Sequence, residues 1–479
     1  MTGESRDVLV DVLDKDPPES LDVNEAIEEA GCGPGTGFLL FTSYAIIALE
    51  AVEVTILAVV GLVLRCEWNL STASMTCLQV SSVVGQFIVA LRFSHVAEKF
   101  GRKPIMLTGA VGLTVFGLLS GLWSQQFWQL FLCRVLVGAT IALCTPAAAI
   151  YPVEVSPISH RTMAQSGIGV AWGSGSILTS VIAYFTLEKF GWRGFLACSA
   201  LLCSPVILLV ALAKESPRYD AYRNRLGSAE ETIRFLHKWN GHGTKMSRSL
   251  RDSNKDMGSD KWKQPEETTI SGLLKTLNKT GKTRDLIFII NMLALSVFVY
   301  NSVAFSSPRF LNEQYCGSVT VSRNQSCVFD KNVLLDIGMV GLSEPIGSVI
   351  LMYLLDSLGR RGANAAITTV TFLVLSGLHI CVNRAYLVFL LMALKGLGNM
   401  VTSVPLVLIR EHFPTRVRGF SFHLAYMVAR VAVILGMSVT QLAYDVSPRL
   451  VLVINQLVVV LSLINQAYLK VETLGVPIE

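Results

Sequence analysis

The residues of this sequence that could do chemistry are ionisable side chains within long apolar stretches. A charge at the middle of a bilayer costs at least ~2.5–3.5 kcal/mol on insertion scales, so such a residue normally pairs with an opposite charge or lines a water-filled cavity. In a cavity it can bind a substrate ion or carry a proton. Seven residues meet this description: Glu50, Glu53, Arg134, Glu344, Lys395, His423 and Arg430.

Glu50 and Glu53 are the two acids of the first apolar stretch. They are three residues apart, which places them on one face of a helix. Two carboxylates that close, partly removed from water, favour a site that binds a proton. Glu53 and Arg134 lie at similar depths in their stretches, which also permits an ion pair between them. A substrate or proton site and a structural ion pair that locks helices together are both open interpretations.

The composition indicates which elements must position these residues. The chain has 479 residues, of which 52% are apolar and 16% are charged. A soluble domain has about 25% charged residues, so we predict an integral membrane protein. Twelve spanning helices need about 240 mostly apolar residues, which the chain can supply. Apolar runs of sufficient length occur at about 38–64, 73–91, 104–123, 127–150, 163–186, 195–213, 286–308, 332–355, 363–382, 385–408, 419–444 and 449–469.

These runs predict an all-α fold of twelve transmembrane helices in two pseudo-symmetric six-helix bundles. They are read as helices because helices satisfy their own backbone hydrogen bonds in lipid. Lys and Arg gather in the loops on the side of the two chain ends, which predicts that both termini are cytosolic. The predicted units are an acidic tail (1–36), the first bundle (37–213), a basic linker loop (214–285), the second bundle (286–470) and a C-terminal tail (471–479).

Two short charged patterns occur once in each half of the chain. Their copies are separated by 258 and 257 residues and keep their order, which is evidence for duplicated halves. The first pattern is Glu98-Lys99-Phe100-Gly101-Arg102-Lys103, matched by Asp356-Ser357-Leu358-Gly359-Arg360-Arg361. The second is Glu154-x-x-Pro157-x-x-x-Arg161, matched by Glu411-x-x-Pro414-x-x-x-Arg418.

The repeated patterns are suited to loops that hold helix ends together. Gly101 and Gly359 permit tight turns, and the basic residues that follow can reach carboxylates or the carbonyls of helix C-termini. We therefore predict latches that clasp the two bundles in one state and release them in the other. The alternative is that these residues only anchor the loops on the cytosolic side.

The longest loop on the predicted outer side covers about 309–331. It contains Cys316 and Cys327, which flank the glycosylation pattern Asn324-Gln325-Ser326. A disulfide between these cysteines and a glycan on Asn324 would suit an oxidising compartment, and two free thiols with an unused glycosylation site are the alternative. The other cysteines show no metal-ligand spacing and are read as packing residues, so we predict no metal site.

The charged patterns also carry a family resemblance. The acid-x-x-Gly-Arg pattern after spans 2 and 8 resembles the signature loop of the major facilitator superfamily, and Arg134-x-x-x-Gly138 is similar to its span-4 motif. Glu215-Ser216-Pro217-Arg218 is similar to the pattern after span 6 in its sugar and organic-ion branches. Four further stretches resemble the synaptic vesicle 2-related proteins: Glu50-Ala51-Val52-Glu53 running to Arg65-Cys66-Glu67-Trp68-Asn69-Leu70-Ser71, Leu342-Ser343-Glu344-Pro345, Ala429-Arg430-Val431 and Val471-Glu472-Thr473.

This resemblance implies which residues face a central cavity. Spans 1, 4, 7 and 10 line the cavity in the superfamily fold. The cavity residues implied in this way are Glu50, Glu53, Arg134, Tyr300 and Lys395, with Glu344 and Arg430 on flanking spans. The resemblance also adds Glu215 and Arg218 to the expected cytosolic latch residues.

We therefore predict a secondary transporter that moves a small organic ion or polar metabolite by alternating access, with protons as a candidate coupling ion. No enzyme and no cofactor are predicted, because the sequence contains no nucleophile–base set and no nucleotide-binding motif. The expected partners are the bilayer and the substrate, without nucleic acid, for a monomer in an intracellular vesicle membrane or the plasma membrane. Two alternatives remain open: a non-transporting vesicle membrane protein that binds a ligand or partner, and an organic cation or anion transporter.

Overall fold

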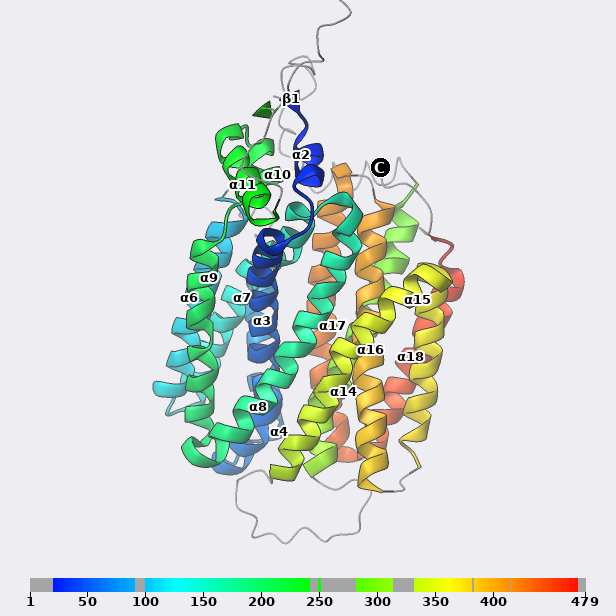
Figure 1. Ribbon diagram of the computed structural model, residues 1–479. Coiled ribbons are helices and arrows are strands. Elements are labelled where there is room, and N and C mark those ends of the chain that lie inside the picture. Colours follow the sequence, from blue (N-terminus) through cyan, green and yellow to red (C-terminus); the bar gives the residue numbers. More distant parts are fainter. Residues whose placement is uncertain are drawn as a thin grey trace, which may run out of the picture.

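The computed structural model describes residues 20–90, 100–241, 249–250, 281–312, 331–380, 383–413 and 415–472. These residues form a bundle of long helices that run side by side along one axis (Figure 1). Within them, ten helical segments are long and apolar enough to cross a membrane. The first described residues and the last described residues, up to Glu472, lie at the same end of the bundle, which we call the termini end, and the opposite end is the far end.

The first half of the chain supplies six spans. One of its helices is interrupted at Gly191, whose φ of 64° belongs to a conformation that favours glycine. The chain turns there, so α8 contains the fifth span and the beginning of the sixth, which α9 completes. The helices of this half are α3 (Pro34–Glu67), α4 (Thr72–Ala90), α6 (Arg102–Leu122), α7 (Phe127–Val155), α8 (Arg161–Leu201) and α9 (Cys203–Leu212).

The second half is built in the same way. Its longest helix is interrupted at Gly359, with φ 72°, and therefore contains spans 8 and 9. Because two of the ten candidate segments each contain two spans, the bundle has the twelve transmembrane helices that the sequence predicts. The helices are α14 (Thr283–Asn312), α15 (Lys331–Gly377), α16 (Arg384–His412), α17 (Thr415–Val446) and α18 (Pro448–Tyr468).

Small residues allow the helices to approach closely, as expected where lipid supplies no hydrophobic driving force between spans. A Cβ atom added at Gly138 of α7 would lie 1.8 Å from the carbonyl oxygen of Ser82 on α4. Between the two halves, a Cβ atom added at Gly173 of α8 would lie 2.4 Å from Cδ of Pro345 on α15. Backbone and side chain therefore touch directly where spans 5 and 8 cross.

The apolar core is shared between the halves at the far end and divided at the termini end. Near the far end, one cluster joins residues of both halves, such as Val59 of α3 and Val303 of α14. Near the termini end, each half has a cluster of its own, represented by Ile141 of α7 and Val404 of α16. The two halves are thus packed together at the far end.

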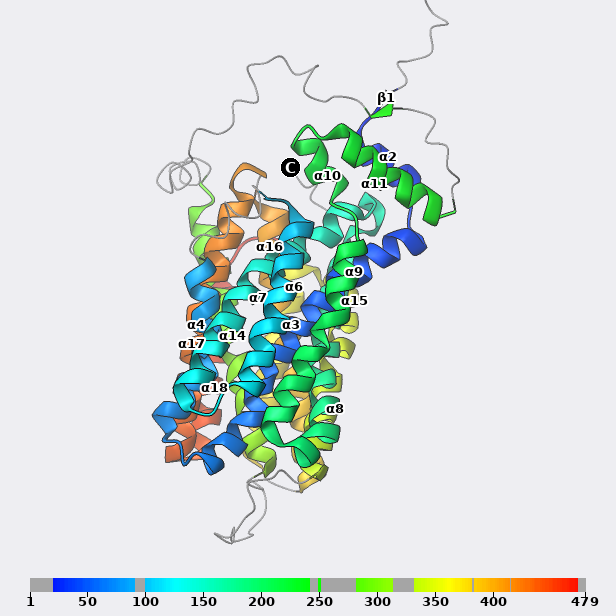
Figure 2. The ribbon, with the colours of Figure 1, turned by 90° about the vertical axis from the view of Figure 1, so that its left-hand side faces the viewer.

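A small cap covers the termini end of the first half (Figure 2). Two of its helices lie in the segment predicted as the linker loop. Apolar residues of α2 pack on α11, with Ile27 and Ile233 both fully buried. The elements of the cap are β1 (Ser20–Leu21), α2 (Val23–Ala30), η1 (Ile158–His160), α10 (Pro217–Tyr222), α11 (Leu226–Trp239) and β2 (Ser249–Leu250), with β1 and β2 paired in parallel.

Candidate functional site

Glu53 and Arg134 form a buried ion pair inside the first half. Nη1 of Arg134 donates to Oε2 of Glu53 at 2.8 Å, and its Nε donates to the hydroxyl of Ser120 at 3.1 Å. The side chain of Arg134 is 0% exposed and that of Glu53 is 1% exposed. Because α3, α6 and α7 all contribute, the pair links three helices of one half. The ion pair that their depths in the sequence permit is therefore present.

Glu50 pairs with a residue of the other half. Its Oε1 lies 3.5 Å from Nη2 of Arg430 on α17, so this contact crosses from span 1 to span 11. The guanidinium of Arg430 also donates to the hydroxyl of Tyr426 and lies over that ring, 4.2 Å from its centroid. Glu50 is 2% exposed. A buried acid of one half thus contacts a cation of the other half.

A second connection between the halves runs through two aromatic residues. Nε1 of Trp172 on α8 donates to the hydroxyl of Tyr300 on α14 at 2.9 Å. The Tyr300 hydroxyl donates in turn to Oε1 of Glu344 on α15 at 2.6 Å. Nζ of Lys395 on α16 lies 3.6 Å from the same carboxylate oxygen. Oε2 of Glu344 is buried and has no hydrogen-bond partner, so one acceptor of this acid is unsatisfied in this conformation.

The structure thus distributes the predicted cavity residues over three acid–base pairs. Glu50 and Glu53 are three residues apart, yet one carboxylate faces the second half and the other faces the interior of the first. Glu344 and Arg430, which the resemblance puts on flanking spans, contact Lys395 and Glu50 directly. His423, two turns before Arg430 on α17, is half-buried. Trp172 and Tyr426 were missed by sequence reasoning, because an aromatic residue in an apolar span gives no separate signal.

The first copy of the repeated pattern forms a compact charge cluster at the termini end. Arg102 donates to both carboxylate oxygens of Glu154, at 3.0 and 2.7 Å. The backbone N–H groups of Arg102 and Lys103 donate to the carboxylate of Glu215. Gly101 has φ 98°, and a Cβ atom there would lie 2.5 Å from Oε2 of Glu215. Burial raises the pKa of Glu215, and the hydrogen bonds from the N–H groups oppose that shift.

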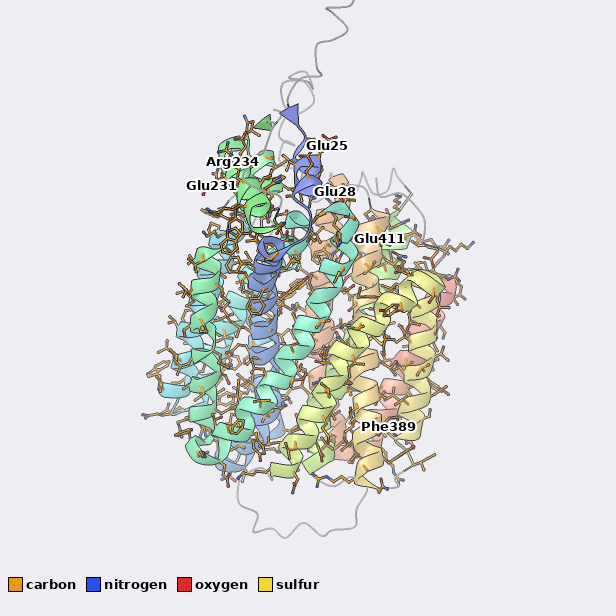
Figure 3. The ribbon with its side chains drawn as sticks, viewed as in Figure 1. Glu25, Glu28, Glu231, Arg234, Phe389 and Glu411 are labelled. Carbon is orange, nitrogen blue, oxygen red and sulfur yellow. The ribbon has the colours of Figure 1, made fainter. Side chains whose placement is uncertain are left out.

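The second copy repeats this geometry in the other half. Arg360 donates to both carboxylate oxygens of Glu411, each at 2.9 Å. The N–H groups of Arg360 and Arg361 donate to the carboxylate of Glu472, each at 3.0 Å. A Cβ atom at Gly359 would lie 2.7 Å from Oε2 of Glu472. Glu411 lies at the termini end in Figure 3, whereas Phe389, on the same helix, lies near the far end.

Glu472 was missed as a cluster residue by sequence reasoning. It follows Glu215 by 257 residues, the offset of the second repeated pattern, so that offset could have identified it. The hydrogen bonds described for Arg102 and Arg360 stay within one half and its adjoining segments. In this conformation these bonds tie loops to their own bundle, so a clasp between the bundles remains a prediction.

The other predicted latch residues are placed as follows. Arg218 donates to Oδ1 of Asn24 at 2.9 Å and to the carbonyl of Ser156 at 3.2 Å, and burial lowers its pKa to about 10. Arg161 donates to the same Asn24 oxygen at 3.5 Å. Asp356 is exposed. Glu98 lies outside the described residues, as do Cys316, Cys327 and Asn324, and for Arg418 the structure describes the helix but not the side chain.

Charged residues at the far end also connect the halves. Asp445 of α17 accepts from Arg309 at 3.1 Å, from Arg65 at 3.5 Å and from the hydroxyl of Thr72. Arg65 and Thr72 belong to the first half, so one carboxylate joins both. Sequence reasoning used the basic residues here only for orientation. It also read Cys66 as a packing residue, which is wrong because Cys66 is disulfide-bonded.

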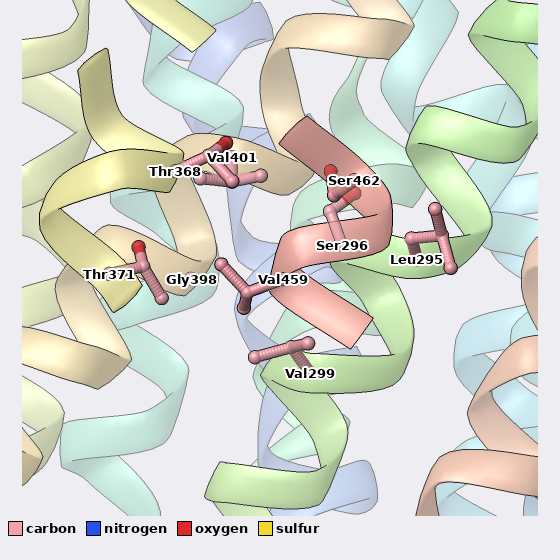
Figure 4. Close-up of a pocket in the computed structure, with 9 residues that line it drawn as sticks. All are labelled: Leu295, Ser296, Val299, Thr368, Thr371, Gly398, Val401, Val459 and Ser462. Carbon is pink, nitrogen blue, oxygen red and sulfur yellow. The ribbon is translucent and has the colours of Figure 1, made fainter. Parts of the chain in front are cut away.

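The pocket drawn in Figure 4 lies inside the second half. It is mainly apolar, with hydroxyl groups from α14, α15 and α18, and none of the paired charges lines it. Its lining residues are Leu295, Ser296, Val299, Thr368, Thr371, Gly398, Val401, Val459 and Ser462. Across the part of the chain that the structure describes, no group of three His, Cys, Asp or Glu side chains could hold a metal ion.

Comparisons with known proteins match almost the whole chain. The family model described as "Sugar (and other) transporter" matches residues 43–479. The "Synaptic vesicle 2-related protein" of Pongo abelii is 25% identical over 464 residues, covering 95% of this chain and 81% of that protein. The protein of the same name from Bos taurus gives the same identity and coverage.

The solved structures that match show the same fold. The proton:xylose symporter XylE of E. coli is 17% identical, with a TM-score of 0.66, and the alignment covers 92% of this chain and 97% of that one. The twelve-helix fold of the major facilitator superfamily, which the sequence predicts, is confirmed by this likeness.

Proposed function

Because the chain belongs to the sugar (and other) transporter family of the major facilitator superfamily, we propose that it moves a small organic ion or polar metabolite by alternating access. Membership of this family makes the chain a membrane transporter and not an enzyme. We propose further that a proton moves with the substrate. The observation that carries the proposal is the set of polar contacts between the halves, Glu50 with Arg430 and Trp172 with Tyr300, which are at least partly buried.

These contacts lie where a substrate between the halves would have to bind. A polar ligand can compete for the loosely held partners, since the Glu50–Arg430 and Glu344–Lys395 ion pairs have distances of 3.5 and 3.6 Å. Both signs of charge are present, so an anionic, cationic or dipolar substrate finds a partner. Tyr300 connects the two halves and bonds to Glu344, so a ligand that displaces it changes the contacts of both halves.

The packing of the bundle supports one closed end. The shared core and the Asp445 cluster join the halves at the far end, whereas the termini-end cores are separate. Alternating access by rocking of two repeats requires such contacts to open when the opposite end closes. The structure would then correspond to a state closed at the far end.

Proton coupling is assigned to Glu50 and Glu53. Each is buried and has one carboxylate oxygen without a hydrogen-bond partner. Uptake of a proton by either acid removes the attraction that holds its arginine, because a neutral carboxyl group no longer compensates the cation. Protonation of Glu50 would loosen a contact between the halves, whereas protonation of Glu53 would loosen helices within the first half.

We assign the termini end to the cytosol. Lys and Arg favour the cytosolic side of spanning helices, and the basic residues of the repeated patterns lie at this end. The disulfide of Cys66 at the far end fits an oxidising lumen or exterior. The likeness to synaptic vesicle 2-related proteins makes an intracellular vesicle membrane the first membrane to examine.

Reconstituted vesicles test the proposal. Purified protein is first screened for thermal stabilisation by organic anions, organic cations and sugars, with xylose included because of the fold match. Compounds that stabilise the protein are then tested for uptake, with a pH dye inside the vesicles. We expect uptake together with a pH change, and we expect Glu344→Gln to abolish uptake. Arg384→Gln, in a far-end ion pair with Asp336, is the control and should leave uptake unchanged.

The outcomes separate the parts of the proposal. Uptake with an unaltered pH change in a Glu50→Gln, Glu53→Gln double variant would refute the assignment of the proton to these acids. Stabilisation by a compound that is never taken up would contradict transport and would favour a protein that binds a ligand on a transporter fold.

A further inference from the structure

The end of α11 is fixed to the beginning of the first spanning helix. Asn240, which follows α11, accepts hydrogen bonds from the N–H groups of Gly35 and Thr36 at 3.0 and 3.2 Å. Its Nδ2 donates to the carbonyls of Ala30 and Gly31, both at 2.9 Å. One side chain therefore caps the N-terminus of α3, whose first N–H groups have no partner within the helix.

The hydrogen bonds of Asn240 fix the position of the neighbouring residue Trp239 relative to α3. A Cβ atom added at Gly35 would lie 2.8 Å from Cβ of Trp239, so α11 ends directly beside the first turn of α3. The first turn of α3 is the place where the chain approaches the membrane. In Figure 2, α11 and the beginning of α3 both extend to the same side of the bundle.

Aromatic side chains of the two helices are joined at this position. The ring of Phe235 lies 6.5 Å from that of Phe38 and 5.9 Å from that of Trp239, between ring centroids. Trp239 is 57% exposed, and Phe41, one turn further into α3, is 58% exposed. An exposed aromatic group at the level of a membrane entry point matches the amphipathic character that places Trp at bilayer interfaces.

We propose that α11 and the first turns of α3 form a membrane-surface anchor, in which Trp239 and Phe41 enter the headgroup layer of the surrounding bilayer. Another face of α11 packs on α2 through Ala229 and Ile233, so α11 lies between α2 and the lipid. Lys238 is exposed beside Trp239 and can extend its ammonium group to the water or the headgroups. The bilayer would thus hold the cap at a defined depth relative to span 1.

Spin labels on the full chain in phosphatidylcholine vesicles test this anchor. Single labels are placed at Trp239→Cys and at Arg234→Cys, in a background in which the exposed Cys32 and Cys77 are replaced by Ser. Arg234, labelled in Figure 3, is on the same helix with a side chain 64% exposed, and it is the matched control. Accessibility to oxygen, which concentrates in lipid, is compared with accessibility to a water-soluble nickel chelate.

The label at residue 239 should be more accessible to oxygen and less accessible to the nickel chelate than the label at residue 234. A second label at Phe41→Cys should show the same shift, and it also provides the answer if the Trp239 variant does not fold. Adding Asn240→Ala should move the 239 label toward the nickel chelate, because the depth of α11 is then no longer fixed. Equal nickel accessibility at 239 and 234, or at 41 and 234, would overturn the proposal.

Discussion

Loss of one member of the Glu53–Arg134 pair should destabilise the protein in a way that the loss of both does not. The atoms are 2.8 Å apart and both side chains are enclosed. At an effective dielectric of about 20, their attraction is about 6 kcal/mol. Removal of one partner from a buried pair typically costs about 3–5 kcal/mol, because the other charge stays buried without compensation.

The two single variants should also differ from each other. In Glu53→Gln, the guanidinium of Arg134 stays charged because arginine does not lose its proton in proteins. This variant should therefore lose roughly 3–5 kcal/mol of unfolding free energy, the full cost of removing one partner. In Arg134→Met, Glu53 can become neutral by taking up a proton, so the loss should be smaller and should shrink as the pH falls. The double variant should lose less than the sum of the single losses.

Unfolding by dodecyl sulfate in mixed micelles, followed by tryptophan fluorescence, measures these free energies. Four proteins are compared in a double-mutant cycle, which isolates the energy of the pair. Additive losses, or an equal loss in the two single variants at every pH, would refute the reasoning that the pair is a buried, mutually compensating unit.

Three further predictions concern the ends of the bundle. Asp445→Asn should open the far end, because one carboxylate holds both halves there, and the thiol of Val303→Cys should then react faster with a membrane-impermeant reagent. Unchanged reactivity would mean that the apolar core alone closes this end. Gly359→Ala should cost about 1–2 kcal/mol of unfolding free energy, because its φ is 72°, whereas the helical Gly362→Ala control should not; equal effects would contradict the turn argument. The pKa of Glu28 is lowered by its hydrogen bonds to η1, so the contribution of Glu28 to docking of α2 on η1 should be present above about pH 4.5 and lost as the pH falls through the lowered value. Spin-label distances between α2 and η1 can show this loss. Glu28→Gln should weaken docking at neutral pH, and a distance that depends on pH in that variant as well would exclude Glu28 as the cause.

The spanning helices could be predicted from the sequence because lipid imposes a simple requirement. A run of about 20 apolar residues must be helical to satisfy its backbone, and the repeated charged patterns added the duplication of the halves. The Glu53–Arg134 pair could also be anticipated, since both residues are costly in lipid and lie at similar depths.

Other features depend on tertiary placement that no local pattern encodes. The direction in which Glu50 points is set by the rotation of α3 against α17, so its contact with Arg430 could not be derived from its spacing to Glu53. The cap was missed because α2 and α11 are short amphipathic helices that become stable only when they pack on each other. Glu472 was missed for a different reason, since its repeat with Glu215 consists of a single residue.

Uptake of a stabilising compound into vesicles that contain only this protein tests the central claim most directly. Transport by alternating access predicts uptake that exchanges labelled for unlabelled compound across the membrane and stops when Glu344 is replaced by Gln. A compound that binds and stabilises the purified protein, yet crosses the membrane no faster than in protein-free vesicles, would contradict the claim.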